Sequence, residues 1–111
     1  MNIEQREIGD VIVLVLAGKI IGGPDATTVN DMLHELIERG NKKIVADLSQ
    51  VNWMNSSGLG ILISALTTTR NAGGELKIAA ATEKIKKLLT ITKLTNVFTL
   101  YPTVDKAVAS F

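Results

Sequence analysis

The sequence predicts an α/β domain whose central β-sheet is mixed but mostly parallel and is covered by about four helices. Runs of aliphatic and β-branched residues alternate along the chain with segments whose apolar residues recur at helical spacing. A Gly-Asp turn near the N-terminus joins two extended segments as a hairpin, and this makes the sheet mixed. A length of 111 residues, 46% of them hydrophobic, fits one compact domain over residues 1–111.

The first 40 residues are predicted to form a hairpin followed by a helix. A polar segment leads into the turn at Gly9 and Asp10, and the apolar run 11–17 is typical of a strand buried on both faces. Pro24 and Asp25 then favour a helix start, because proline fits the first helical position and an acid fits the positive helix end. The inward face of this helix comprises Val29, Met32, Leu33, Leu36 and Ile37.

The rest of the chain continues the alternation of strand and helix. Strands separated by helices in this way pair in parallel through right-handed crossovers. The predicted segments are a short strand at 44–48 followed by a polar loop, a helix that starts at the serines 56–57 and stops at 71–74, a strand at 76–80, a short helix capped by Thr82, a strand at 97–101 and a closing helix over 104–111.

Composition excludes several classes of function. Twelve basic and eleven acidic side chains give a net charge of +1, which predicts no direct nucleic-acid binding. The chain has no cysteine, and His34 is its only histidine, so we expect neither a metal site nor a cofactor. The N-terminal residues lack a secretory pattern, and the run 11–17 is too short to span a bilayer. These features predict a cytoplasmic protein without membrane insertion, whose partner is another protein.

The segment 53–60 places two adjacent hydroxyls between a strand and a helix. Gly58 and Gly60 match neither a P-loop nor a dinucleotide fingerprint, so they are interpreted as turn and close-packing glycines. Ser56 and Ser57 lack the Gly-x-Ser-x-Gly context of a nucleophile elbow, and His34 lies on the polar face of the predicted first helix. We therefore predict a protein that is not an enzyme and has no catalytic residue.

Two roles for the serine pair stay open on residue chemistry alone. Asn55, Ser56 or Ser57 can each cap the following helix, a contribution of about 0.5–2 kcal/mol. A phosphate on one of the hydroxyls would be stabilised by the free N–H groups and the positive dipole end of that helix. Capping is the more common role of such residues, and the two roles are compatible.

The stretch 47–60, together with Gly73-Gly74-Glu75-Leu76-Lys77, resembles the STAS domain family, specifically its bacterial anti-sigma factor antagonists. The likeness extends over essentially the whole chain. In that family the loop reads Met-Asp-Ser-Ser/Thr-Gly-Leu-Gly, which corresponds here to residues 54–60. The resemblance implies that Ser56 is the phosphorylated residue, with Ser57 as the second choice.

The same resemblance implies a partner-switching function. An unphosphorylated antagonist binds an anti-sigma factor that is a serine kinase of the histidine-kinase-like ATPase fold, and so relieves inhibition of the sigma factor. Phosphorylation of the serine ends the complex, and a PP2C-type phosphatase resets the cycle. We expect Trp53, Met54, Gly58 and Leu59 to form an apolar contact patch. The expected partner-binding residues are Trp53, Met54, Asn55, Ser56, Ser57, Gly58, Leu59, Lys19 and Asp25.

The chain departs from the family pattern at two places. Asn55 replaces the aspartate before the serine, keeping the capping oxygen but losing the charge. The loop 18–25 carries Lys19 where antagonists often have acids, and Lys19 is a candidate to pair with a phosphate on Ser56. The loss of the aspartate leaves an alternative open: a constitutive STAS scaffold subunit of a lipid ABC transporter or of a larger signalling assembly, in which Asn55 marks a loop that is never phosphorylated.

Overall fold

The computed structural model describes residues 1–111 as one α/β domain with a five-stranded sheet in the order β1-β2-β3-β4-β5 and four helices. Strand β1 is antiparallel to β2, and all other neighbouring strands are parallel. The predicted mixed, mostly parallel sheet is therefore confirmed. The elements are β1 (Asn2–Ile8), β2 (Val11–Ile20), α1 (Pro24–Glu38), β3 (Lys43–Met54), α2 (Ser56–Asn71), β4 (Glu75–Ala79), α3 (Glu83–Ile91), β5 (Leu100–Tyr101) and α4 (Val104–Ala109).

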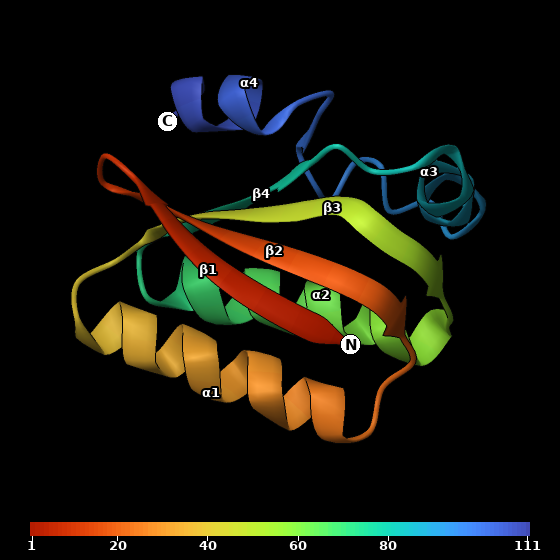
Figure 1. The fold of residues 1–111 in the computed structure, drawn as a ribbon, viewed down its shortest axis with the longest axis horizontal. Helices are drawn as coiled ribbons and strands as arrows, with labels where there is room; N and C mark the ends of the chain where they lie inside the picture. Colours follow the sequence, from red (N-terminus) through yellow and green to blue (C-terminus); the bar gives the residue numbers. More distant parts are fainter.

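The helices cover the two faces of the sheet unequally. Helices α1 and α2 lie against one face, α4 lies over the other, and α3 stands beside the end of β3 (Figure 1). The core beneath α1 and α2 holds 22 buried residues and the core beneath α4 only 6, so most of the hydrophobic stabilisation comes from the first face. Strand β2 is buried on both faces from Val11 to Leu16, as its apolar run predicts.

The hairpin turn is closed by a glycine and an ion pair. Ile8 pairs with Val11, which leaves Gly9, at a φ of 61°, and Asp10 as the two turn residues. The ammonium of Lys43 lies 2.6 Å from Oδ2 of Asp10. The hydrogen bond and charge of Lys43 hold the pKa of the Asp10 carboxyl below its ordinary value. The start of β3 is thus fastened to the β1–β2 turn.

Strand β3 is longer than the predicted strand at 44–48, and this corrects the expected polar loop. Ile44, Ala46 and Leu48 face the larger core at every second position, but the next residues buried there are Val51 and Met54. The pairing with β2 shifts once between Val15 and Ala17 and again between Gly18 and Lys19, each time adding a residue to β3. Such bulges invert the alternation of side chains, so the pattern of β3 reads as a loop in the sequence.

The predicted strand at 97–101 is likewise corrected, since only Leu100 and Tyr101 pair with β4. The backbone N–H groups of Val97 and Phe98 instead donate to the carbonyl of Leu94 in the turns after α3. Phe98 belongs to this turn and not to a strand, and its side chain is buried in the core. A buried aromatic beside β-branched residues predicts a strand, but tertiary packing overrides that preference here.

Candidate partner-binding site

Helix α2 begins at the serine pair, and Asn55 caps it. Oδ1 of Asn55 accepts a hydrogen bond from the N–H of Gly58 at 2.8 Å, with Asn55 in an extended conformation. Nδ2 of the same side chain donates to the carbonyl of Ile21 at 3.5 Å. Of the three possible caps, Asn55 is therefore the one that caps α2. Its amide group also joins the helix start to the β2–α1 loop.

Ser56 and Ser57 occupy the first two positions of α2, and both are exposed. Their backbone N–H groups have no hydrogen-bond partner within the protein, as expected of a helix start. Ser57 packs against the β2–α1 loop, since a Cβ added to Gly22 would lie 2.9 Å from the Cβ of Ser57. Ser57 also lines a groove of about 210 Å³ between α1 and α2, whereas Ser56 does not.

Gly58 brings the start of α2 into direct contact with the end of β2. A Cβ at this position would lie 1.9 Å from the carbonyl oxygen of Ile20, so no side chain fits there. A Cβ added to Gly60 would meet nothing within 4 Å, so that position is under no such constraint. The interpretation of Gly58 as a close-packing residue is confirmed, and the contact fixes where the serines stand relative to the sheet.

The expected apolar contact patch is wrong for three of its four residues. Met54 and Leu59 are 5% and 3% exposed, and Gly58 is buried against β2. Met54 turns inward because the second bulge of β3 restores its side to the larger core, and Leu59 faces the sheet with the rest of the apolar stripe of α2. Trp53 alone is exposed, at 41%. A partner at this end of the molecule meets the side chain of Trp53 and the two hydroxyls.

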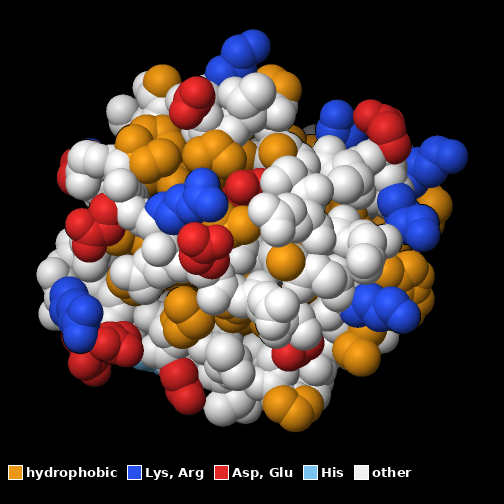
Figure 2. Space-filling model, viewed as in Figure 1, with side chains coloured by type: hydrophobic (Ala, Val, Ile, Leu, Met, Phe, Trp, Pro, Cys, Tyr) orange, Lys and Arg blue, Asp and Glu red, His pale blue; other side chains and the backbone are white.

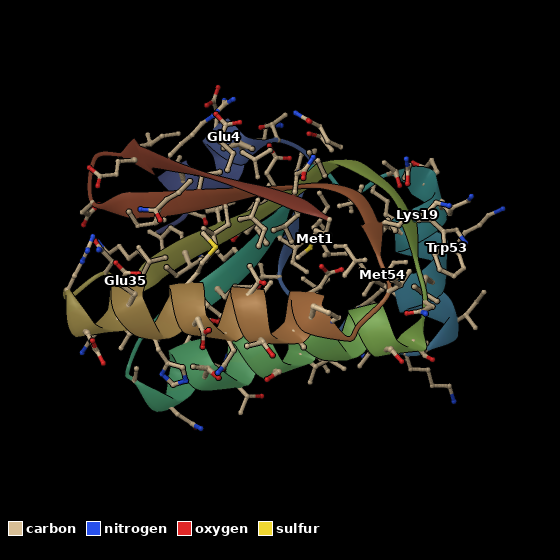
Figure 3. All side chains as sticks on the ribbon, turned by 60° about the horizontal axis from the view of Figure 1, so that its bottom comes forward. Met1, Glu4, Lys19, Glu35, Trp53 and Met54 are labelled. Atoms are coloured by element: carbon tan, nitrogen blue, oxygen red, sulfur yellow. The ribbon has the colours of Figure 1, made fainter.

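Trp53 lies beside Lys19, its register partner on β2, at the end of the sheet that faces α3 (Figure 3). Together they line a surface hollow of about 470 Å³, and a second hollow of about 250 Å³ continues along α3 past Trp53. The two are called the Trp53 hollow below. Its lining residues are Lys19, Ile21, Asn52, Trp53, Met54, Lys84, Ile85, Lys87, Leu88 and Ile91.

The contribution of α3 to this surface is missed by the sequence reasoning. Lys84, Lys87 and Ile91 are spaced by three and four residues and therefore share one face of the helix. Ile91 lies outside the inward stripe formed by Ile85 and Leu89, and it is 77% exposed. An isoleucine out of phase with the buried stripe is the signal in the sequence that could have indicated a second apolar surface.

The two remaining residues of the expected binding set lie apart from each other. Lys19 is exposed within the Trp53 hollow, and its pairing with a phosphate on Ser56 stays a prediction. Asp25 stands in the first turn of α1, where Oδ1 of its carboxylate lies 3.9 Å from the N-terminal amine of Met1. Asp25 is not part of the Trp53 hollow.

No group of three metal-ligating side chains comes together in the structure. His34 is exposed on α1, on the polar face that its helical position predicts. No helix of the structure is both long and apolar enough to cross a bilayer. The structure does show an exposed helix start, at Ser56, and a surface hollow at the same end of the molecule.

Fold and site together define a class of protein, a small mixed α/β domain that presents the start of a helix and an exposed aromatic residue at one end of its sheet. The family model described as the STAS domain matches residues 2–107. The chain belongs to the STAS domain family.

Several named proteins are similar to this chain in sequence or in fold. The anti-sigma-B factor antagonist of Bacillus subtilis is 27% identical over 97 residues, which are 87% of each chain. A candidate anti-sigma factor antagonist from Thermotoga maritima has the same fold, with a TM-score of 0.87 at 22% identity over 97% of this chain and 92% of that one. The Bacillus cell fate determinant SpoIIAA, solved in its phosphorylated form, gives a TM-score of 0.75 at 14% identity over 98% of each chain.

Proposed function

We propose that this chain is an anti-sigma factor antagonist that binds a kinase/anti-sigma factor through the start of α2 and is released when Ser56 is phosphorylated. The partner is a serine kinase of the histidine-kinase-like ATPase fold, and a PP2C-type phosphatase removes the phosphate. Support comes from the family, from the named antagonist in Bacillus subtilis and from the fold of phosphorylated SpoIIAA.

The observation that carries the proposal is the placement of Ser56. It is exposed at the first position of α2, where two free backbone N–H groups and the positive helix end meet solvent. Ser57, in contrast, has Gly22 of the β2–α1 loop close to its Cβ. Asn55 caps the helix whether or not Ser56 is phosphorylated, because its cap bond goes to Gly58.

The switch follows from local electrostatics. Phosphorylation adds about −1.5 to −2 charges to a helix start that has no charged side chain of its own, since residues 48–69 contain none. A hundredfold weakening of binding needs only about 2.8 kcal/mol, which desolvation and repulsion at one phosphate readily supply. The helix end holds the phosphate in place, so we expect no change in the fold.

The test is phosphorylation by a kinase of the proposed class, taken from the same organism as this chain. The wild type, Ser56→Ala and Ser57→Ala are each incubated with the kinase and ATP, and their intact masses are measured. We expect one added phosphate on the wild type and on Ser57→Ala, and none on Ser56→Ala. Alanine is tolerated at the first two positions of a helix, so all three proteins fold.

Three outcomes would count against the proposal. An unmodified wild type that still binds the kinase removes the switch and favours the constitutive scaffold. Co-purification with a transporter ATPase, together with binding that ignores an acidic residue at position 56, favours the scaffold directly. A phosphate on Ser57 instead of Ser56 would overturn the assignment of the residue.

A further inference from the structure

The Trp53 hollow combines exposed apolar side chains at one place on the surface. Trp53, Ile21 and Ile91 are 41%, 51% and 77% exposed, and they come from three segments that are far apart in the chain. Large apolar side chains gathered in this way mark interaction surfaces, whereas single ones are ordinary. The concave shape between them gives room for side chains of another molecule.

Every charged side chain that lines the hollow is a lysine. Lys19, Lys84 and Lys87 form no salt bridge, while Lys86 on the same helix pairs with Glu83 at 3.5 Å. Basic side chains, interspersed with hydrophobic ones, gather along the edge that carries α3 (Figure 2). In a chain of net charge +1, three unpaired cations around one hollow concentrate positive potential there.

The lysines and the aromatic ring stand on rigid elements. Lys19 and Trp53 are register partners on β2 and β3, and Lys84 and Lys87 share one face of α3. Asn55 joins the β2–α1 loop to the start of α2 through its bond to Ile21. The hollow is therefore built before any partner arrives, which lowers the ordering cost of binding.

We propose that the Trp53 hollow binds an acidic segment of a protein partner, with a carboxylate among the three lysines and a neighbouring apolar side chain on Trp53. This proposal rests on the proposed function, because it takes the partner that covers Ser56 to extend over the hollow. Three cations match one or two carboxylates, whereas nucleic acid requires many phosphate contacts. A helix that lies on a membrane buries a broad apolar face, whereas Ile91 is the one large apolar side chain of α3 that is exposed.

The hollow also suggests why a phosphate on Ser56 would weaken binding of the partner. Ser56 follows Trp53 by three residues, at the helix that begins where β3 ends. A phosphate on Ser56 would add negative charge at the same end of the molecule as the acidic segment that the lysines attract, and like charges repel. The same lysines would also be partly neutralised by the phosphate. Both effects weaken binding without any movement of the backbone.

The test uses the single tryptophan of the chain as its reporter. The protein is titrated with the acetylated and amidated hexapeptide EDLEID while the fluorescence of Trp53 is recorded, and with its basic counterpart KKLKIK. We expect a saturable change with EDLEID at a Kd of about 1 mM or below, and none with KKLKIK. Raising the salt concentration is expected to weaken the binding, because exposed charges carry it.

Charge reversal supplies the controls. The double variant Lys84→Glu and Lys87→Glu is expected to bind EDLEID at least about tenfold more weakly. Lys106→Glu on α4 is the control for charge reversal away from the hollow, since Lys106 is also exposed and forms no salt bridge, and it is expected to behave as wild type.

Three results would overturn the inference. They are no saturable change with EDLEID, equal affinity of the double variant, and a response only to phosphatidylglycerol vesicles, which would make the surface a membrane contact. Phosphorylation of Ser56 is measured with the kinase and not with the peptide. A negative peptide titration would therefore leave the proposed function untouched. A failure of the proposed function would appear separately, as a missing phosphate in the intact masses of the kinase assay.

Discussion

At the scale of the residue, Asn55 performs two tasks that an aspartate could not combine. Its oxygen accepts from Gly58 and its amide nitrogen donates to the carbonyl of Ile21. An ionised carboxylate keeps the first bond and loses the second, because it has no donor. The residue that replaces the family's aspartate thus keeps the helix cap and adds a tie to the β2–α1 loop.

Replacing Asn55 separates these tasks. Asn55→Ala removes the cap, and we expect it to lower the free energy of unfolding by about 1 kcal/mol. Asn55→Asp keeps the cap and gains about 0.3–1 kcal/mol from the helix dipole, which offsets the lost bond to Ile21. Urea denaturation of both variants measures the difference. Equal loss in the two variants would show that the cap bond contributes nothing.

At the scale of the element, the serine loop is positioned by the contact of α2 with β2. Gly58 allows the helix start to touch the carbonyl of Ile20, and Gly22 allows the β2–α1 loop to pass Ser57. Both glycines serve a close approach, and Gly22 also has a φ of 93° that side-chain-bearing residues rarely adopt. The site is therefore fixed by backbone packing more than by side-chain bonds.

Two glycines in the same helix test this packing. Gly58→Ala places a methyl group into the carbonyl of Ile20, and we expect it to cost more than about 3 kcal/mol of unfolding free energy. Gly60→Ala meets open space inside the helix and is expected to add about 0.5–1 kcal/mol. Thermal unfolding of the pair measures both values. A Gly58→Ala protein as stable as wild type would contradict the close contact.

The elements also show where sequence reasoning succeeds and where it stops. The strand buried on both faces at 11–17 and the inward stripe of α1 are predicted because their periodicity is undisturbed. Strand β3 is cut short in the prediction because two bulges break its alternation, and the burial of Met54 is missed for the same reason. The Trp53 hollow is formed by residues in and next to β2, β3 and α3, which are far apart in the chain. A local sequence pattern cannot predict that they come together.

At the scale of the whole molecule, the two ends of the sheet have different roles. The end that carries the β1–β2 turn is fastened by the pair of Lys43 and Asp10. On the face under α4, the ammonium of Lys77 lies 4.3 Å from the ring centre of Phe111 and donates to Ser110. At the opposite end, near Trp53 and the start of α2, Lys19, Lys84 and Lys87 form no salt bridge. This division leaves one end of a rigid domain available for a partner.

The ion pair at the fastened end predicts a dependence of stability on pH. The pKa of Asp10 is lowered in the folded protein by Lys43, so its contribution is present above the ordinary carboxyl pKa and is lost as pH falls through the folded value. We expect Lys43→Ala to be less stable than wild type at neutral pH and the difference to shrink in acid. NMR titration measures the pKa of Asp10 in the wild type and in Lys43→Ala. An identical pKa in the two proteins would contradict the pairing.

The affinity of the anti-sigma factor kinase for the two forms of this protein tests the proposed switch most directly. Unphosphorylated protein and protein phosphorylated on Ser56 are each titrated into the kinase in a calorimeter at the same salt concentration. We expect the phosphorylated form to bind about a hundredfold more weakly, which corresponds to about 2.8 kcal/mol. Equal affinity of the two forms would contradict a switch at Ser56.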